Sequence, residues 1–302
     1  TAELLLTEGE DARRYAKWIS VNAGPNHVGV QLHACPILPG ELLNRELWPK
    51  VRAAAITSAT LTSCGDFGYF LREAGLERDP AVTTISVASP FDYAQQGELV
   101  IQKTLAAPRA LDDYNAEVSR LIIQAIPSSR AGALVLFTSR RHLEATVELL
   151  SDELKERVLV QGMVGRSALL ERHKARVNSG LPSIILGLQG FGEGRDLPGA
   201  LLEDLYIAKL PFASPSGPLD EARAEYVEAE GGDAFNDLVV PATGLRLLQW
   251  VGRGVRTETD FARIVCFDSR LTDRAFGRKM LSGLPPYPIR QIAVRRETAD
   301  LI

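Results

Sequence analysis

The sequence predicts an α/β protein in which a parallel β-sheet carries helices on both faces. From about Ala53 onward, short β-rich runs alternate with segments of helical periodicity, and this order builds a parallel sheet. Several of these runs, such as Leu134 to Phe137, are apolar at every position, as expected for strands covered on both sides. We therefore expect strands at residues 53–58, 82–87, 133–137, 157–161, 183–188, 204–210 and 262–267.

Segments of helical period lie between these strands. Ser139 is well placed to cap the second helix, and Thr243 or Gly244 is placed to cap the fourth. Because ligands of parallel sheets bind where the strands end, the loops that follow the strands are the expected sites. The helices are expected at residues 112–126, 140–150, 167–178, 245–255 and 273–281.

Two parts of the chain do not follow this alternation. Residues 210–241 open with a turn rich in proline and serine, and we expect a long excursion from the sheet there. Residues 1 to about 52 show no regular order of strands and helices, so we interpret them as the tail of a preceding domain.

Charge and cysteine content exclude several classes of protein. The net charge of −4 argues against binding nucleic acid by bulk positive charge, so any such contact must use a local patch, amides and hydroxyls. The three cysteines are far apart, which indicates a reducing, cytoplasmic environment without a disulfide framework or a cysteine metal site. No apolar run reaches the ~20 residues of a membrane span, and no signal peptide opens the chain, so we expect no membrane partner.

The sharpest local signal is the arginine segment, residues 249–256. On a helix, Gln249, Gly252, Arg253 and Arg256 would form one stripe at positions i, i+3, i+4 and i+7. A mid-stripe glycine lets a ligand approach the backbone, and two guanidinium groups beside it suit a phosphate. The alternative is an ordinary amphipathic helix with two solvated arginines.

A glycine-rich segment, residues 189–199, follows the buried strand at 183–188. It is not a dinucleotide fingerprint, because Arg195 stands where the third glycine belongs. Amides in such a turn can still bind an anion, with Glu193 and Gly194 at its centre, and Asp196 could pair with an arginine or reach a ribose. The alternative is a tight turn without a ligand.

Hydroxyl side chains follow two other strands. Ser58 and Thr60 come after residues 53–57, and Thr138, Ser139 and Arg140 come after the strand that ends at residue 137. Hydroxyls and first-turn amides at strand ends can hold a sugar–phosphate backbone without reading its sequence. Either turn alone is also explained by ordinary turn and cap preferences.

Together, in this order and spacing, the four segments resemble the C-terminal half of a superfamily 2 helicase, most closely the DinG branch of the XPD-like helicases. Ser58-Ala59-Thr60 is similar to motif III, Phe137-Thr138-Ser139 to motif IV, residues 187–197 to motif V, and residues 249–256 to motif VI. The resemblance covers nearly the whole chain.

The resemblance implies a RecA-like second motor domain over residues 64–302, after a remnant of the first motor domain and its arch at 1–63 that ends in motif III. By family analogy, Arg253 meets the γ-phosphate of ATP and Arg256 is the arginine finger, while Gln249, Gly252, Glu193, Gly194 and Asp196 bind or couple the nucleotide. Ser58, Thr60, Thr138, Ser139, Arg140 and Gln189 would contact nucleic acid.

Three parts of such a motor are missing from these 302 residues. No lysine follows a glycine, so there is no phosphate loop, and the two Asp-Glu pairs lie outside strand ends, so there is no Walker B site. The cysteine set of an iron–sulfur cluster is also absent. We expect these parts, with Mg²⁺ and any such cluster, on a missing first motor domain, and we expect the isolated chain to be inactive.

The expected activity of the full-length protein is ATP-driven movement along single-stranded or forked DNA, in the 5′-to-3′ direction by resemblance, with DNA–RNA hybrids as further substrates. Two alternatives stay open. One is a non-catalytic nucleic-acid-binding module of helicase shape. The other is an unrelated enzyme that holds a nucleotide cofactor in residues 190–194.

Overall fold

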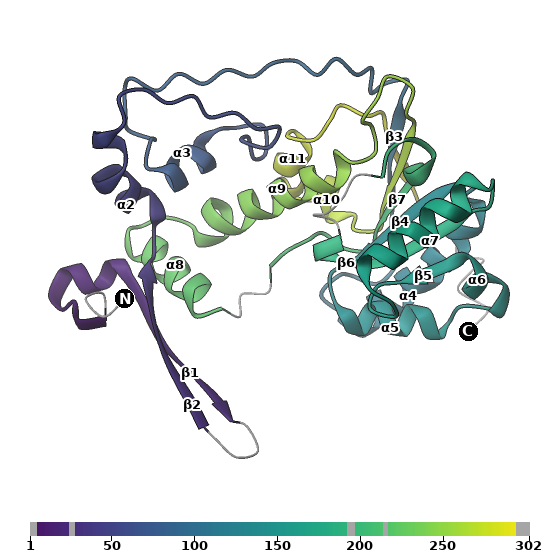
Figure 1. Cartoon of the computed structure of the whole chain (residues 1–302), viewed down its shortest axis with the longest axis horizontal. Coiled ribbons are helices and arrows are strands. Elements are labelled where there is room, and N and C mark those ends of the chain that lie inside the picture. Colours follow the sequence, from purple (N-terminus) through teal and green to yellow (C-terminus); the bar gives the residue numbers. More distant parts are fainter. Residues whose placement is uncertain (1–4, 24–27, 192–196, 214–216, 294–302) are drawn as a thin grey trace. The chain divides into compact units, whose positions relative to one another are not determined.

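The computed structural model describes residues 5–23, 28–191, 197–213 and 217–293 of the chain (Figure 1). It divides into unit 1, Thr1–Ser86 with Phe212–Thr243, and unit 2, Val87–Pro211 with Gly244–Ile302. These boundaries do not coincide with a single division at residue 63. The assignment of residues 1–63 to the remnant of a first motor domain stays a prediction.

Unit 2 is built on a seven-stranded sheet with the order β5-β6-β4-β7-β8-β3-β9. Every neighbouring pair is parallel, so the predicted α/β class is confirmed. Strands β4 to β8 lie close to their predicted positions, whereas β3 and β9 were not predicted. The bounds are β3 Gly97–Gln102, β4 Gly132–Phe137, β5 Val158–Val160, β6 Ser183–Leu188, β7 Asp204–Ile207, β8 Ala262–Cys266 and β9 Ile289–Ile292.

Helices cover both faces of this sheet. Val118 and Ile122 of α4 and Leu143 of α5 pack with alternate strand residues in one buried cluster. On the opposite face, His173 of α7 bonds through Nδ1 to Ser183 Oγ at 2.9 Å. Strand residues of both alternations are 0% exposed, so the sheet is a double-sided core. The helices of unit 2 are α4 Leu111–Ala125, α5 Arg140–Glu148, α6 Asp152–Arg157, α7 Arg166–Asn178, α10 Arg270–Asp273 and α11 Ala275–Leu281, with short turns η3 Ile126–Ser128, η4 Gln189–Phe191 and η5 Gly199–Leu202.

Two helix starts test the predicted caps. Ser139 caps α5 as predicted, because its side chain accepts a hydrogen bond from the N–H of His142 at 3.2 Å. The other cap prediction was wrong: α9 spans Val240–Val251, so Thr243 and Gly244 lie inside the helix. The π-helical turn η6, Phe235–Val239, runs directly into α9, so the chain is already helical before either residue.

Unit 1 joins the first 86 residues to the excursion at 212–243. Ser63 Oγ donates to the carbonyl of Pro241 at 2.6 Å, and Arg223 of α8 pairs with Glu73 of α3. Helices α2 and α3 touch at two glycines: a Cβ on Gly40 would lie 2.2 Å from a carbonyl oxygen, and Gly75 has φ +71°. The helices and turns are η1 Gly9–Arg14, α2 Pro39–Glu46, η2 Trp48–Lys50, α3 Gly68–Ala74 and α8 Pro218–Ala229.

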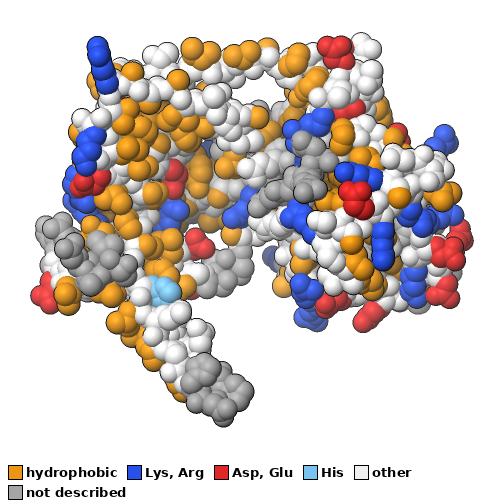
Figure 2. Space-filling view, in the orientation of Figure 1, with side chains coloured by type: hydrophobic (Ala, Val, Ile, Leu, Met, Phe, Trp, Pro, Cys, Tyr) orange, Lys and Arg blue, Asp and Glu red, His pale blue; other side chains and the backbone are white. Residues whose placement is uncertain are grey.

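Strands β1, Tyr15–Ala23, and β2, Val28–Pro36, form an antiparallel two-stranded ribbon that the sequence analysis did not predict. The register puts Ile19 opposite Leu32 and Val21 opposite Val30, so these four side chains share one face. All four are between 56% and 65% exposed, and hydrophobic side chains are visible along the ribbon in Figure 2. One face of the ribbon is therefore aliphatic and exposed.

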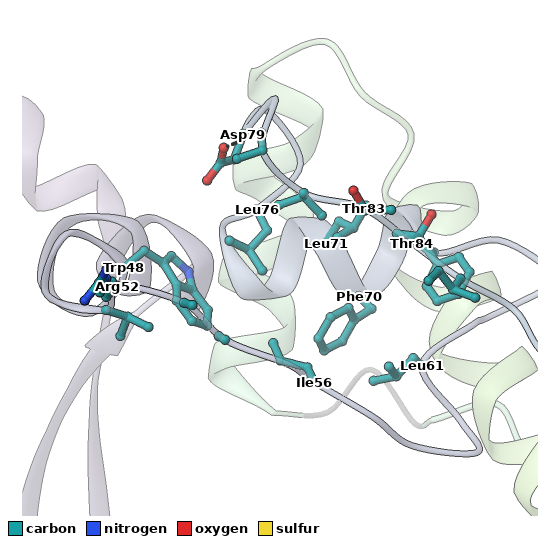
Figure 3. A pocket seen from close by; sticks show the side chains of 17 residues that line it. Trp48, Arg52, Ile56, Leu61, Phe70, Leu71, Leu76, Asp79, Thr83 and Thr84 are labelled. Carbon is teal, nitrogen blue, oxygen red and sulfur yellow. Dashed lines mark hydrogen bonds between the residues drawn. The ribbon is translucent and has the colours of Figure 1, made fainter.

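The predicted strands at 53–58 and 82–87 are not strands in this structure. Both segments have no regular secondary structure, and no backbone hydrogen bond joins residues 53–58 or 83–87 to another part of the described chain. They border a groove of about 460 Å³, in which Phe70 of α3 points toward Ile56 and Leu61 (Figure 3). A strand needs a hydrogen-bonded neighbour, and the described residues supply none here.

None of the helices in the described ranges is long and apolar enough to cross a membrane.

Candidate functional site

The carboxyl edge of the sheet, where the strands end, brings together the residues predicted to contact nucleic acid in unit 2. The parallel register sets Phe137 of β4 opposite Leu188 of β6, so Thr138 and Gln189 leave this edge from adjacent strands. Ser139 and Arg140 follow at the first turn of α5, and the Arg140 side chain is 66% exposed. The exposed first turn of a helix offers amides and a positive field to an anion.

Two side chains that the sequence analysis missed shape the same edge. Gln161 Oε1 accepts the N–H of Leu188 at 2.7 Å, which fixes the start of the glycine-rich segment. The Arg166 guanidinium lies 4.9 Å from the ring centre of Phe191, and Phe191 is only 3% exposed. The usable signal for Gln161 was its position at the end of an expected strand.

The arginine segment is not one continuous helical stripe, which corrects the predicted spacing. Helix α9 ends at Val251, and Gly252 still bonds to the carbonyl of Leu248 at 2.8 Å. Arg253 lies in the turn that follows, while Arg256 lies beyond the helical hydrogen bonds altogether. Glycines at positions 252 and 254 permit this early end, because glycine favours the helix least among residues other than proline.

Burial separates the two arginines. Arg253 is 8% exposed, and Arg256 is among the exposed residues. Gln249, one helical turn before Arg253 on α9, is half-buried. Arg253 is therefore packed into the fold, and Arg256 lies at the surface.

Asp260 organises the backbone around Arg256. Its Oδ2 accepts the N–H groups of Arg256 at 2.8 Å and Thr257 at 2.9 Å, and its Oδ1 accepts the Thr257 hydroxyl at 2.6 Å. Although burial opposes ionisation, these hydrogen bonds and one from the Gly199 N–H hold the pKa of Asp260 below its usual value. The carboxylate therefore stays ionised at neutral pH and joins the arginine segment to the end of the glycine-rich segment.

The end of the arginine segment lies at the amino edge of the sheet, where the strands begin. Gly254 approaches Ala262, the first residue of β8, closely enough that an added Cβ would lie 2.4 Å from the alanine Cβ. Gly199 and Asp260 precede β7 and β8. The expectation that the whole site follows strand ends is wrong for Arg256, because the arginine segment comes before β8 in the chain and lies beside the first residue of that strand.

The glycine-rich segment thus has its two ends at different edges. Gln189 leaves β6 at the carboxyl edge, and Gly199 meets Asp260 at the amino edge. Since β6 has six residues, the two edges are about 20 Å apart. Glu193, Gly194 and Asp196 lie between these ends but outside the described residues.

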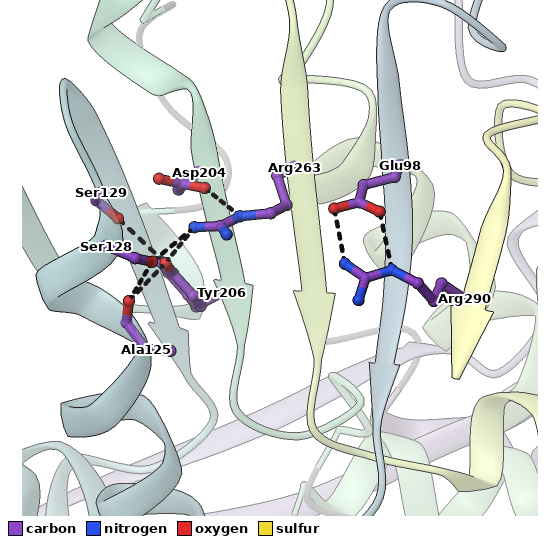
Figure 4. A network of polar contacts seen from close by, with 8 residues as sticks. All are labelled: Glu98, Ala125, Ser128, Ser129, Asp204, Tyr206, Arg263 and Arg290. Carbon is purple, nitrogen blue, oxygen red and sulfur yellow. Dashed lines mark hydrogen bonds and ion pairs between the residues drawn. The ribbon is translucent and has the colours of Figure 1, made fainter. Parts of the chain in front are cut away.

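The amino edge also carries two ion pairs between neighbouring strands, shown in Figure 4. Arg263 of β8 donates through Nε to Asp204 of β7 at 2.7 Å and through Nη2 to the Tyr206 hydroxyl at 3.2 Å. Arg290 of β9 pairs with Glu98 of β3 at 3.0 Å. These contacts join neighbouring strands, and the two arginines are paired with carboxylates of the sheet itself.

Ser58 and Thr60 belong to unit 1 and form a local turn there. The Ser58 hydroxyl accepts the N–H of Thr60 at 3.2 Å and lies 3.3 Å from its hydroxyl. No three His, Cys, Asp or Glu side chains of the described ranges are grouped so that they could hold a metal ion.

A parallel sheet of this order, with helices on both faces and an arginine segment held beside Gly199, is typical of the class of RecA-like motor domains. The chain belongs to the helicase C-terminal domain family, whose model matches residues 122–287. A relative from Photobacterium profundum, named ATP-dependent DNA helicase DinG, is 37% identical over 279 residues. The relative of the same name from Escherichia coli (strain K12) is 30% identical over 278 residues. The predicted resemblance to DinG-type helicases is therefore confirmed.

The chain spans 39% of the length of each of these two relatives, and they cover 90% and 91% of it. A solved structure of apo XPD matches 65% of this chain and 39% of its own, with a TM-score of 0.50 at 13% identity. That match supports the RecA-like fold.

Proposed function

We propose that this chain is the carboxyl-terminal motor half of an ATP-dependent DNA helicase that translocates on single-stranded DNA. The observation that carries the proposal is the division of one sheet into two functional edges. Hydroxyls, amides and Arg140 lie at the carboxyl edge with Gln189, and the backbone of Arg256 is held at the amino edge by Asp260, which also bonds to Gly199.

Arg256 would act on ATP as an arginine finger. Arg256 lies at the surface, where its guanidinium would meet a phosphate held by another part of the protein and stabilise the charge that develops on the transferred phosphoryl group. Arg253 would meet the γ-phosphate from the more buried position, with Gln249 and Gly252 beside it. Glu193, Gly194 and Asp196 would couple nucleotide state to Gln189.

The carboxyl edge would hold the DNA backbone. Thr138, Ser139 and Gln189 supply hydroxyl and amide groups, and Arg140 supplies a charge-assisted contact to phosphate. Such contacts read no base, which suits a motor that moves along any sequence. Ser58 and Thr60 would add a contact from unit 1. Forked DNA and DNA–RNA hybrids, and movement in the 5′-to-3′ direction, are part of this proposal by family analogy.

The phosphate loop, the Walker B carboxylates, Mg²⁺ and any iron–sulfur cluster would belong to a first motor domain outside these 302 residues. Two features of unit 1 support this division. The aliphatic face of the β1–β2 ribbon is exposed, and residues 53–58 and 83–86, which have the composition of strands, have no hydrogen-bonded neighbour in the described chain. Unpaired strand-like segments of this kind are completed when a neighbouring sheet pairs with them.

Phosphate release tests the proposal. The purified 302-residue chain should show no DNA-stimulated ATP hydrolysis, because it has no phosphate loop. In the complete polypeptide, Arg256→Ala should lower the rate of ATP hydrolysis by ~10³-fold or more while most affinity for single-stranded DNA is kept. Arg172→Ala, at an exposed arginine of α7, is the matched control and should change neither property.

A non-catalytic nucleic-acid-binding module would give a different result. Its complete polypeptide would bind DNA but have no ATP hydrolysis for Arg256→Ala to remove. DNA-stimulated hydrolysis by the isolated chain would contradict the proposed division of the ATP site between two domains.

A further inference from the structure

We infer that Asp260 is a positioning residue for ATP hydrolysis, which holds the backbone of Arg256 and so fixes the point from which its side chain starts. This inference rests on the proposed function of Arg256. Asp260 itself would touch neither nucleotide nor DNA, and it would act only by holding the backbone of Arg256.

The need for such a residue follows from where the helix ends. A helical residue is held by its hydrogen bonds to neighbouring turns, but α9 ends at Val251, five residues before Arg256. An exposed arginine in irregular backbone would lose considerable conformational entropy whenever it met a phosphate. Something other than the helix must restrict its backbone in advance.

Asp260 provides that restriction with two oxygens. The N–H groups of Arg256 and Thr257 both point at Oδ2, at 2.8 and 2.9 Å, which fixes the peptide between these two residues. The Thr257 hydroxyl donates to Oδ1 at 2.6 Å, and the Gly199 N–H also donates to the carboxylate. Hydrogen bonds to an ionised acceptor are stronger than bonds between neutral groups, so the arrangement is rigid.

Asp260 is itself anchored to the sheet. It is 6% exposed, and Gln96 Nε2 donates to its carbonyl at 3.2 Å and to the Thr257 carbonyl at 2.8 Å. The carbonyl of Gln96 in turn accepts the N–H of Ala262 at 2.9 Å, where β3 and β8 begin. A short chain of hydrogen bonds, through Asp260 and Gln96, thus connects the backbone of Arg256 to the start of the buried sheet.

Asparagine at position 260 would break this arrangement at nearly unchanged volume. Its amide nitrogen carries hydrogens, so one of the two sets of donors would face another donor instead of an oxygen. Glu258, exposed in the same loop, offers a matched substitution, Glu258→Gln, which removes the same charge outside the hydrogen-bond network.

The experiment compares steady-state ATP hydrolysis by complete polypeptides carrying Asp260→Asn, Glu258→Gln, Arg256→Ala, or Asp260→Asn with Arg256→Ala. We expect Asp260→Asn to lower kcat by about 10- to 100-fold, the cost of misplacing a catalytic group, with little change in the KM for ATP or in DNA affinity. Glu258→Gln should keep the original kcat. The double variant should be no slower than Arg256→Ala alone, because Asp260 has nothing to position once the guanidinium is gone.

The outcomes separate this inference from the proposed function. If Arg256→Ala leaves hydrolysis intact, the proposed arginine finger is wrong. If Arg256→Ala removes hydrolysis but Asp260→Asn does not, only the inference is wrong. Equal losses from Asp260→Asn with and without Arg256 would also overturn it, since they would show a general structural effect.

Thr257→Val guards against loss of folding in the asparagine variant. It removes the hydroxyl bond to Asp260 Oδ1, together with the contact to the Thr259 hydroxyl at 3.3 Å, and keeps the shape of the side chain. A several-fold fall in kcat at unchanged thermal stability would support the inference, and an unchanged kcat would contradict it.

Discussion

Removing the ring of His142 should make unit 2 less sensitive to acid. His142 is 2% exposed, and its ring lies 5.0 Å from that of Phe137 in an edge-on contact. Burial lowers the pKa of His142 from 6.5 to about 4, although a main-chain hydrogen bond with Asn115 opposes this shift. In the described part of the chain its Nε2 atom has no hydrogen-bond partner.

The direction of the pH effect on stability follows from comparing the protonation of His142 in the unfolded and folded chain. Below pH 6.5 the unfolded chain takes up a proton on this residue, but the folded chain does so only near pH 4. Stability therefore falls as the pH falls between these values and is unaffected by this group above them. Integrating from about pH 7.5 to about pH 5 gives a loss of about 2 kcal/mol in the free energy of unfolding.

Urea denaturation at these two pH values measures the loss. Trp250 is 0% exposed and lies in unit 2, so its fluorescence reports unfolding once Trp18 and Trp48 are replaced by phenylalanine. In that background, His142→Leu should reduce the pH-dependent loss by about 2 kcal/mol. The remaining loss belongs to other groups, including His173, whose pKa burial also lowers. The same loss with and without His142→Leu would refute the reasoning.

Two further predictions concern packing and charge in unit 2. Gly132→Ala should destabilise the fold by about 3 kcal/mol or more, because its Cβ would lie 2.1 Å from a carbonyl oxygen. A Cβ at Gly190 would meet nothing within 4 Å, so Gly190→Ala should change the free energy of unfolding by no more than about 0.5 kcal/mol. Thermal unfolding measures both variants, and equal losses for Gly132→Ala and Gly190→Ala would contradict the prediction. Arg263→Leu should lower the free energy of unfolding by about 2 kcal/mol, because it leaves the Asp204 carboxylate, whose side chain is 9% exposed, without its cation. The 31% exposure of the Arg263 side chain keeps this loss below that of a fully buried pair. Adding Asp204→Asn should recover part of that loss, and no recovery would show that the ion pair is not the cause.

Strands with an apolar run buried on both faces could be predicted from the sequence, and β4 and β6 are examples. Strand β9 could not, because its four residues carry an arginine and a glutamine and three of them are exposed. The segments at 53–58 and 82–87 have the residues of strands, but pairing depends on a neighbour that local sequence does not specify.

Part of the candidate site could be predicted in the same way. Residue types and spacing identified Arg253, Arg256 and the turn at Thr138, since each is visible in a short stretch of sequence. The hydrogen bonds around Asp260 involve Gly199 and Gln96, which are distant in the chain and could not be predicted from local sequence. Asp260 does follow Arg256 by four residues, a spacing that suits a carboxylate closing a turn, and this was the available signal.

Strand β3 has consequences for how the protein acquires its fold during synthesis. It is the first strand of its sheet to leave the ribosome, yet both of its neighbours, β8 and β9, are made last. More than 150 residues separate Leu99 from Ile264 and Ile289, its partners in the register. The nascent chain must therefore carry an apolar, unpaired segment until β8 and β9 have been made, and termination before β8 would leave that segment open to aggregation.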